Sequence, residues 1–239
     1  MMLGIRPAGA VAMDSPRFIV HPDRASCARS LAAELGARLG AARQAGAPAR
    51  LLLPGGQSPL PLLEQLAGEA LDWTRIELSP SDERWVAADD PASNLRLLHG
   101  TLPQARALDP RQGDSPEAAA CAWGQRLAGW LPLTATLLGM GEDGHIASLF
   151  PGMPGLAAAL DAQAAPAALV GLAPVEPRTR LTPNLALLLA SDWLGLLVFG
   201  AAKRALLEAV LTDAPAVREL PVAALARAAG ARLQIHWAP

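Results

Sequence analysis

The feature that most constrains the fold is a regular succession of short apolar segments and helical segments along the chain. The apolar segments predict strands at residues 18–20, 50–53, 75–78, 134–138, 168–172, 194–199 and 232–237. Helical segments lie between them, at residues 24–44, 60–70, 93–102, 115–131 and 182–190 and after Gly200. Strands that alternate with helices favour a parallel sheet covered by helices on both faces. The sequence therefore predicts an α/β fold with a mostly parallel sheet.

The starts of several helices carry their own signals. Residues 24–44 place leucines four positions apart, which is the spacing of an amphipathic helix. Ser115-Pro116 combines an N-cap serine with a proline at the first helical position. Ser58 and Thr182-Pro183 are interpreted in the same way, as the caps of the helices that follow them.

Length and composition indicate one main hydrophobic core. The chain has 239 residues, of which 51% are apolar and 18% charged, which fits a single folded domain. We expect that domain over residues 17–239, with residues 1–16 as a loose extension whose apolar part is too short for a secretory signal. The formal net charge is −2 and Lys203 is the one lysine. A nucleic-acid surface needs clustered Lys and Arg, so no nucleic-acid partner is expected.

Two further features bear on the cellular compartment. The apolar stretch 185–199 is interrupted by Asp192 and is too short to span a membrane, so no membrane contact is expected. Cys27 and Cys121 lie far apart in the sequence and form no C-x-x-C pair. That usage fits a reducing compartment and argues against a cysteine metal site. We therefore expect a cytoplasmic protein.

The candidate catalytic stretch reads LLGMGEDGHIASLFPG, from Leu137 to Gly152. An apolar strand stops at a glycine, and two more glycines space out Asp143 and His145. Such a turn places polar side chains at the carboxyl edge of a sheet, where open α/β sheets bind ligands. A histidine with an aspartate two residues before it suits a general base held by a carboxylate. A plain strand-to-helix turn with a surface histidine is equally compatible with this stretch alone.

Two other strand ends carry polar loops. Pro54-Gly55-Gly56-Gln57-Ser58-Pro59 joins a strand to a helix, and this geometry turns backbone N–H groups toward an anion. Ser79-Pro80-Ser81-Asp82-Glu83-Arg84-Trp85 follows the next strand, although a solvated turn would look the same. Lys203 lies near the end of the strand at 194–199, where a phosphate group can reach it, but it is also compatible with an ordinary surface lysine.

Four stretches in this order carry a family resemblance: PGGQSP, SDERWV with a following SN, LLGMGEDGHIASLFPG, and RLT with a downstream GAAK. Together they resemble the 6-phosphogluconolactonases, within the group that includes the glucosamine-6-phosphate deaminases, over roughly residues 18–237. The resemblance implies a three-layer α/β sandwich related to ribose-5-phosphate isomerase and to the deaminases. It implies hydrolysis of 6-phospho-D-glucono-1,5-lactone to 6-phospho-D-gluconate, the second step of the oxidative pentose phosphate pathway.

The resemblance also assigns roles to individual residues. Those expected to bind the substrate phosphate are Gly55, Gly56, Ser58, Arg180 and Lys203. Those expected at the reacting centre are His145, Asp143 and Arg84. Two positions depart from the family pattern. Gln57 stands where the family has a hydroxyl residue, so one hydroxyl donor is lost, and Glu176 stands near the place of a family lysine.

The implied chemistry is undemanding, because a δ-lactone is an activated ester. One positioned water, one base and stabilisation of the oxyanion should suffice, so neither a metal nor a cofactor is expected. Glycine N–H groups and Arg84 are both candidates for the oxyanion donor. The expected partner is a small sugar-phosphate lactone, and the protein is expected to be a monomer or a small homo-oligomer.

Two alternatives to the lactonase stay open. The first is an aldose–ketose isomerase that deaminates glucosamine 6-phosphate, but that family carries a needed acid where this chain has Ser148-Leu149-Phe150-Pro151. The second is a sugar-phosphate-sensing module that kept the pocket and lost the chemistry, against which the intact Asp143 and His145 count.

Overall fold

The computed structural model describes residues 15–239, so the extension expected at residues 1–16 lies outside the described residues except for Ser15 and Pro16. The strands of the main sheet are β1 (Arg17–Val20), β2 (Ala49–Leu53), β3 (Ile76–Pro80), β5 (Arg106–Ala107), β6 (Ala135–Gly139), β9 (Leu194–Phe199) and β10 (Leu233–Ala238). The helices are α1 (Arg24–Gln44), α2 (Leu60–Ala67), α3 (Asn94–Thr101), α4 (Pro116–Ala128), α5 (Leu156–Ala159), α6 (Leu185–Leu189), α7 (Ala201–Leu211) and α8 (Pro221–Ala229). Short 3-10 turns lie at Trp73–Arg75, Pro215–Val217 and Gly230–Arg232.

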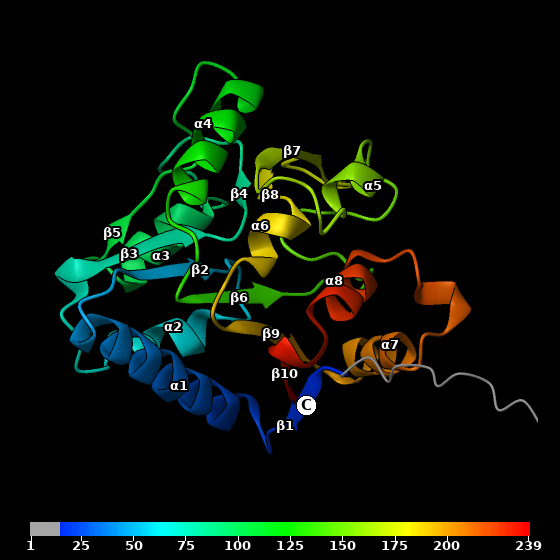
Figure 1. The fold of residues 1–239 in the computed structure, drawn as a ribbon, viewed down its shortest axis with the longest axis horizontal. Coiled ribbons are helices and arrows are strands. Elements are labelled where there is room, and N and C mark those ends of the chain that lie inside the picture. The colour runs from blue at the N-terminus through cyan, green and yellow to red at the C-terminus, as the bar shows by residue number, and fades with distance from the viewer. Residues whose placement is uncertain (1–14) are drawn as a thin grey trace, which may run out of the picture.

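The seven strands of the main sheet are in the order β1-β10-β9-β6-β2-β3-β5, and all neighbouring pairs are parallel. Helices cover both faces, as Figure 1 shows for α1 and α2 on one side and α6 and α8 on the other. The predicted parallel sheet with helices on both faces is therefore confirmed.

Two hydrophobic cores lie on the two faces of this sheet. Side chains alternate along each strand, so Leu51 and Leu53 pack in the core beneath α1 and α2 while Leu52 packs in the opposite core. Leu137 and Leu138 of β6 divide between the two cores in the same way. A strand that is buried on both faces has a continuous run of apolar residues, and such runs made these strands predictable from the sequence.

A second sheet is antiparallel and has the order β4-β8-β7, with β4 at Glu83–Arg84, β7 at Ala168–Leu172 and β8 at Thr179–Pro183. The strand predicted at 168–172 is confirmed, but it belongs to this sheet. The interpretation of Thr182-Pro183 as a helix cap is wrong. Both residues extend β8, and Asn184 caps α6 by accepting a hydrogen bond from the N–H of Leu187.

Helix starts agree with the sequence signals in two of the other cases. The helix predicted at 24–44 is α1, and Ser115 caps α4 with Pro116 at its first position. Ser58 does not cap α2, because Pro59 occupies the N-cap position without a side-chain bond. The hydroxyl of Ser58 is exposed instead, which leaves it available to a ligand.

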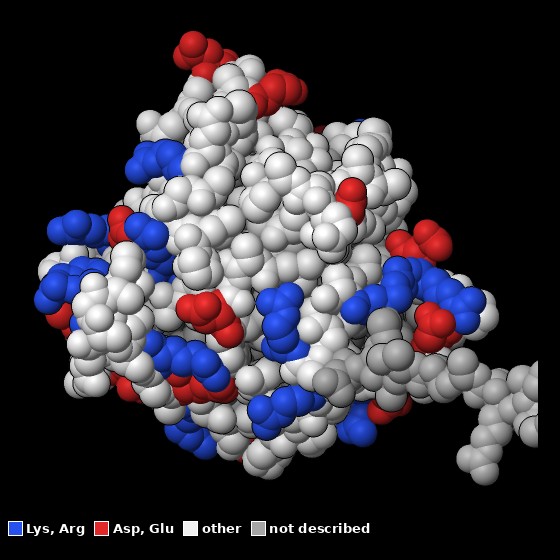
Figure 2. Space-filling model, in the orientation of Figure 1, with Lys and Arg blue, Asp and Glu red and all other residues white. Residues whose placement is uncertain are grey.

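Charged side chains are dispersed over the surface. On the face shown in Figure 2, Lys and Arg are interspersed with Asp and Glu rather than gathered in one basic stripe. That face therefore offers a nucleic-acid backbone no continuous basic track. Within residues 15–239, no helix combines the length and the apolar character needed to cross a bilayer.

Candidate active site

The candidate site is a cavity at the carboxyl ends of four neighbouring strands, β9, β6, β2 and β3. Its volume is about 270 Å³. Six of the residues predicted at the site line it, namely Gly55, Gly56, Ser58, Arg84, His145 and Lys203. The sheet order brings these residues together, because each follows the end of one of the strands or comes from β4 of the second sheet.

Asp143 holds the ring of His145 from the side. Its Oδ1 lies 2.6 Å from Nδ1 of His145 and also accepts from the backbone N–H of His145 at 3.2 Å. The ring of Phe150 packs on the imidazole, with centroids 4.4 Å apart. A carboxylate is only an acceptor, so this contact favours the tautomer with the proton on Nδ1. Nε2 is then the nitrogen that can take up a proton.

The glycines of this turn are required by its geometry. A Cβ on Gly141 would collide with the ring of His145 and the carboxylate of Asp143. Gly144 has a φ of +79°, a conformation that other residues adopt only with strain. The turn is closed internally by a hydrogen bond from Gly141 N–H to the carbonyl of His145, at 3.0 Å.

The glycine loop after β2 is shaped by a side chain from another element. A Cβ on Gly55 would overlap the amide of Asn94, which lies at the start of α3. Gly56 has a φ of +88°, so the loop reverses direction where only glycine is favoured. The loop that we expect to bind an anion thus forms a turn between β2 and α2, with Ser58 exposed on the cavity wall.

Arg84 and Arg180 are direct cross-strand partners in β4 and β8. Arg84 lines the cavity and donates to the carbonyl of Ala92, whereas Arg180 is not among the lining residues and is only 6% exposed. Nε of Arg180 has no hydrogen-bond partner within the described part of the chain. Burial lowers the pKa of Arg180, and the charge of Arg84 lowers it further. The carboxylates of Asp82, Glu83 and Glu176 oppose these shifts, so the charge of Arg180 already has anionic groups near it.

Sequence reasoning missed a polar network on the wall after β3. Asp82 lines the cavity, and its carboxylate accepts hydrogen bonds from Ser148 Oγ and, at 3.3 Å, from Nδ2 of Asn94. Ser81 lines the same wall, and its buried hydroxyl has no partner among residues 15–239. The only sequence signal was the SDER cluster itself, since the partners of Asp82 come from other segments of the chain.

The interpretation of Glu83 as part of a solvated turn is wrong, because its side chain is completely buried. Its two oxygens accept from the N–H groups of Arg84, Asn94 and Leu95 and from the hydroxyl of Ser93. Burial raises the pKa of Glu83, and these N–H groups and Arg111 partly offset the rise. Glu83 therefore anchors the start of α3, and with it Asn94, to the cavity wall.

Metal ligands are not grouped in the described part of the chain. Within residues 15–239, no three His, Cys, Asp or Glu side chains are placed to hold a metal ion together.

Comparison with known proteins identifies the family. The model of the glucosamine-6-phosphate isomerases/6-phosphogluconolactonase family matches residues 22–237. The chain belongs to this family. The matched range contains every residue of the candidate site, from Gly55 in the glycine loop to Lys203.

Members of this family include close relatives of the chain. It is 39% identical over 246 residues to a 6-phosphogluconolactonase of Pseudomonas putida, covering 99% of this chain and 100% of the relative. A crystal structure of a 6-phosphogluconolactonase from Shewanella baltica superposes with a TM-score of 0.84 at 28% identity, covering 95% and 99% of the two chains.

A monomeric glucosamine-6-phosphate deaminase shares the fold at 18% identity, with a TM-score of 0.76 over 93% of this chain and 97% of that one. The predicted fold class, a three-layer α/β sandwich of this group, is therefore confirmed.

Proposed function

We propose that this protein is a 6-phosphogluconolactonase, a carboxylic ester hydrolase that converts 6-phospho-D-glucono-1,5-lactone and water into 6-phospho-D-gluconate. The observation that carries the proposal is the His145–Asp143 pair on the wall of a cavity that also contains the glycine loop and Lys203. The names of the relatives support the same activity. The reaction belongs to the oxidative pentose phosphate pathway.

His145 acts as the general base. With Nδ1 bonded to Asp143, Nε2 takes a proton from a water molecule as the water oxygen attacks the lactone carbonyl carbon. The bond between that carbon and the ring oxygen then breaks, and the ring oxygen takes the proton from Nε2, which returns His145 to its neutral form. General-base assistance of this kind contributes roughly 10²–10⁴-fold. Asp143 orients the imidazole and stabilises its cationic form.

The remaining predicted residues bind the negatively charged groups of the substrate, namely the developing oxyanion and the phosphate. Arg84 borders the cavity, and its guanidinium is the donor that we propose for the developing oxyanion, because the N–H groups of Gly141 and Gly144 already bond within their own turn. The loop of Gly55, Gly56 and Ser58, together with Lys203, binds the phosphate group. Arg180 contributes its charge from β8, where it is the cross-strand partner of Arg84.

The structure supports the lactonase over the deaminase at the residues that follow His145. Ser148, Leu149 and Phe150 are buried, and the hydroxyl of Ser148 donates to Asp82. No acid stands at this place in the sequence to serve a ring-opened amino sugar. We further propose that residues 17–239 act as one domain, as a monomer or a small homo-oligomer in the cytoplasm.

The deciding experiment is a coupled assay on freshly generated 6-phosphogluconolactone. The product is measured with 6-phosphogluconate dehydrogenase, and spontaneous hydrolysis is subtracted. We expect faster hydrolysis with the protein, unchanged by a metal chelator, and no ammonia from glucosamine 6-phosphate. Ammonia release would assign the chain to the deaminases, and binding of the sugar phosphate without turnover would assign it to the sensing modules. Inhibition by the chelator would contradict the metal-free mechanism.

A further inference from the structure

The loop that carries His145 is attached to helix α8. The backbone N–H of Val222, at the second position of α8, donates to the carbonyl of Gly144 at 3.0 Å. Within the described part of the chain, this is the one hydrogen bond that joins residues 141–145 to a different helix or strand. Gly144 directly precedes His145, so the bond acts one residue away from the proposed base.

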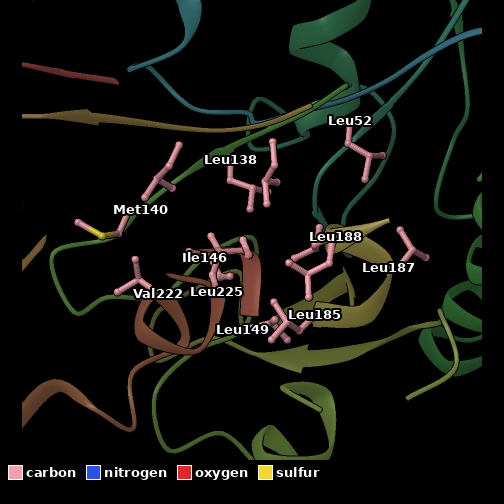
Figure 3. Packing of buried hydrophobic residues seen from close by; sticks show 14 of the residues in the cluster. Leu52, Leu138, Met140, Ile146, Leu149, Leu185, Leu187, Leu188, Val222 and Leu225 are labelled. Carbon is pink, nitrogen blue, oxygen red and sulfur yellow. The ribbon is translucent and has the colours of Figure 1, made fainter. Parts of the chain in front are cut away.

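Side-chain packing reinforces this attachment. A Cβ built on Gly144 would lie 2.9 Å from Cδ1 of Leu220 and 3.3 Å from Cγ1 of Val222, so both side chains are in close contact with the turn. Val222 is fully buried. Figure 3 shows Val222 and Leu225 of α8 beside Met140 and Ile146, the two residues that flank the turn.

The start of helix α8 is itself held in place by hydrogen bonds. It begins at Pro221 and has no side-chain cap, so its first N–H groups need other acceptors, and the Gly144 carbonyl supplies one. The segment that precedes the helix is held by a hydrogen bond from Leu220 N–H to the carbonyl of Val217 at 3.1 Å, and by one from Arg227 to the carbonyl of Arg218 at 2.9 Å.

The hydrogen bond between His145 and Asp143 cannot fix the position of the turn relative to the rest of the cavity. Both residues lie in the same turn and move with it, so their hydrogen bond fixes the ring relative to the turn and not relative to the substrate. A displacement of about 1 Å at a reacting group is enough to lower a rate roughly 10²-fold. The turn therefore needs a support outside itself.

We propose that Leu220 and Val222 are positioning residues that hold the His145 turn against the cavity, an inference that rests on the proposed lactonase function. Neither residue lines the cavity. They act by fixing the position of Gly144, and through it the direction of the His145 imidazole.

The first test is kinetic. Leu220→Ala and Val222→Ala should each lower kcat by about 10- to 100-fold, with KM within about two-fold of the wild-type value, because binding residues stay in place while the base is displaced. Leu220→Met should restore most of kcat. Leu211→Ala is the matched control, since Leu211 is a partly buried leucine at the end of α7 that packs on the same core without contacting Gly144.

The second test does not depend on turnover. The Cε1–H resonance of His145, assigned by its loss in His145→Gln, reports the position of the imidazole against the ring of Phe150, which lies outside the turn with its centroid 4.4 Å away. Leu220→Ala should shift or broaden that resonance, and Leu211→Ala should leave it unchanged. Wild-type kcat and an unmoved resonance in Leu220→Ala would overturn the proposal. Absence of lactone hydrolysis by the wild-type protein would refute the proposed function, and the resonance would still report whether α8 positions the turn.

Discussion

At the scale of single residues, the proposed chemistry depends on how the two nitrogens of His145 are used. Because Nδ1 is bonded to Asp143, replacing the ring removes the base but leaves the turn closed by its backbone bonds. We expect His145→Gln to lower kcat by roughly 10²–10⁴-fold with an unchanged unfolding midpoint. Steady-state kinetics and thermal unfolding check this. His99→Gln, on the exposed side of α3, is the control, and near-normal turnover by His145→Gln would show that His145 is structural.

The charge of Lys203 gives a second prediction. Lys203 lines the cavity at the start of α7, where a phosphate oxygen can accept from its ammonium group. A charge-assisted hydrogen bond is worth about 1.5–3 kcal/mol, so Lys203→Ala should lower kcat/KM by about 10- to 150-fold on the phosphorylated lactone. The variant and the wild type should hydrolyse unphosphorylated glucono-δ-lactone equally slowly. An equal loss on both substrates would remove Lys203 from the phosphate site.

Site residues differ in how visible they are in the sequence. Asp143, His145, Gly55 and Gly56 stand in glycine turns directly after strands, so local sequence alone makes them candidates for the site. The contacts of Asn94 with the glycine loop and of Leu220 with Gly144 join segments that are remote in the chain, and an isolated sequence contains no sign of them.

At the scale of elements, Glu83 connects the wall of the cavity to helix α3. Its carboxylate accepts hydrogen bonds from the N–H groups of Asn94 and Leu95 and from the hydroxyl of Ser93, all at the start of the helix. Removing a buried acceptor leaves each donor unsatisfied, at a cost of about 1–3 kcal/mol per group. Glu83→Ala should therefore lower the free energy of unfolding by more than about 3 kcal/mol in a urea titration.

The exposed Glu64 of α2 supplies the matched control, because Glu64→Ala removes a carboxylate of the same kind without burying a donor. Glu83→Gln should fall between the two, since an amide keeps one of the two acceptor oxygens. A Glu83→Ala variant as stable as Glu64→Ala would mean that the start of α3 finds other acceptors.

Elements were predictable where their own residues determine them. Helix α1 has leucines at helical spacing and an Asp23 cap, and its bounds match the predicted range of 24–44. Thr182-Pro183 failed as a helix signal because the same residues satisfy a strand, in which Thr182 and Pro183 pair with Leu169 and Ala168. The choice between strand and cap depends on the partner β7, which local propensity does not specify.

At the scale of the whole molecule, a buried histidine pair joins the end of the edge strand β1 to its neighbour β10. Nε2 of His21, just after β1, lies 3.1 Å from Nδ1 of His236 in β10. Burial lowers the pKa of His236 from 6.5 to about 4, although Glu34, with an oxygen 4.0 Å from Nε2, opposes the shift. Burial also lowers the pKa of His21.

This pair makes stability depend on pH in a defined direction. Between pH 6.5 and about 4 the unfolded chain binds a proton at His236 that the folded chain does not bind, so the free energy of unfolding should fall as pH is lowered through this window. The full loss is about 3 kcal/mol, at 1.36 kcal/mol per pKa unit. Urea titrations at a series of pH values measure it.

The control for this prediction is His236→Gln, which keeps a polar side chain without a titrating group. Its stability should change less between pH 6.5 and 4 than that of the wild type. A wild-type stability that stayed level over this window would contradict the assignment of His236 as a neutral buried ring.

The order of the strands in the main sheet could not be predicted from the sequence. Alternation of strands and helices predicts parallel neighbours, but it does not say that β1 pairs with β10 while β2 pairs with β3 and β6. The antiparallel sheet of β4, β8 and β7 was also invisible, because β4 is only two residues long.

The pairing of β1 with β10 has a consequence for biosynthesis. β1 has β10 as its single neighbour in the sheet, and His21 is separated from His236 by 215 positions. At about 5–20 residues per second, a ribosome takes roughly 10–40 seconds to cover that interval. Throughout that time the nascent chain presents an apolar strand, Arg17–Val20, without its neighbour. β1 can therefore take its place in the sheet only after the final strand has been translated.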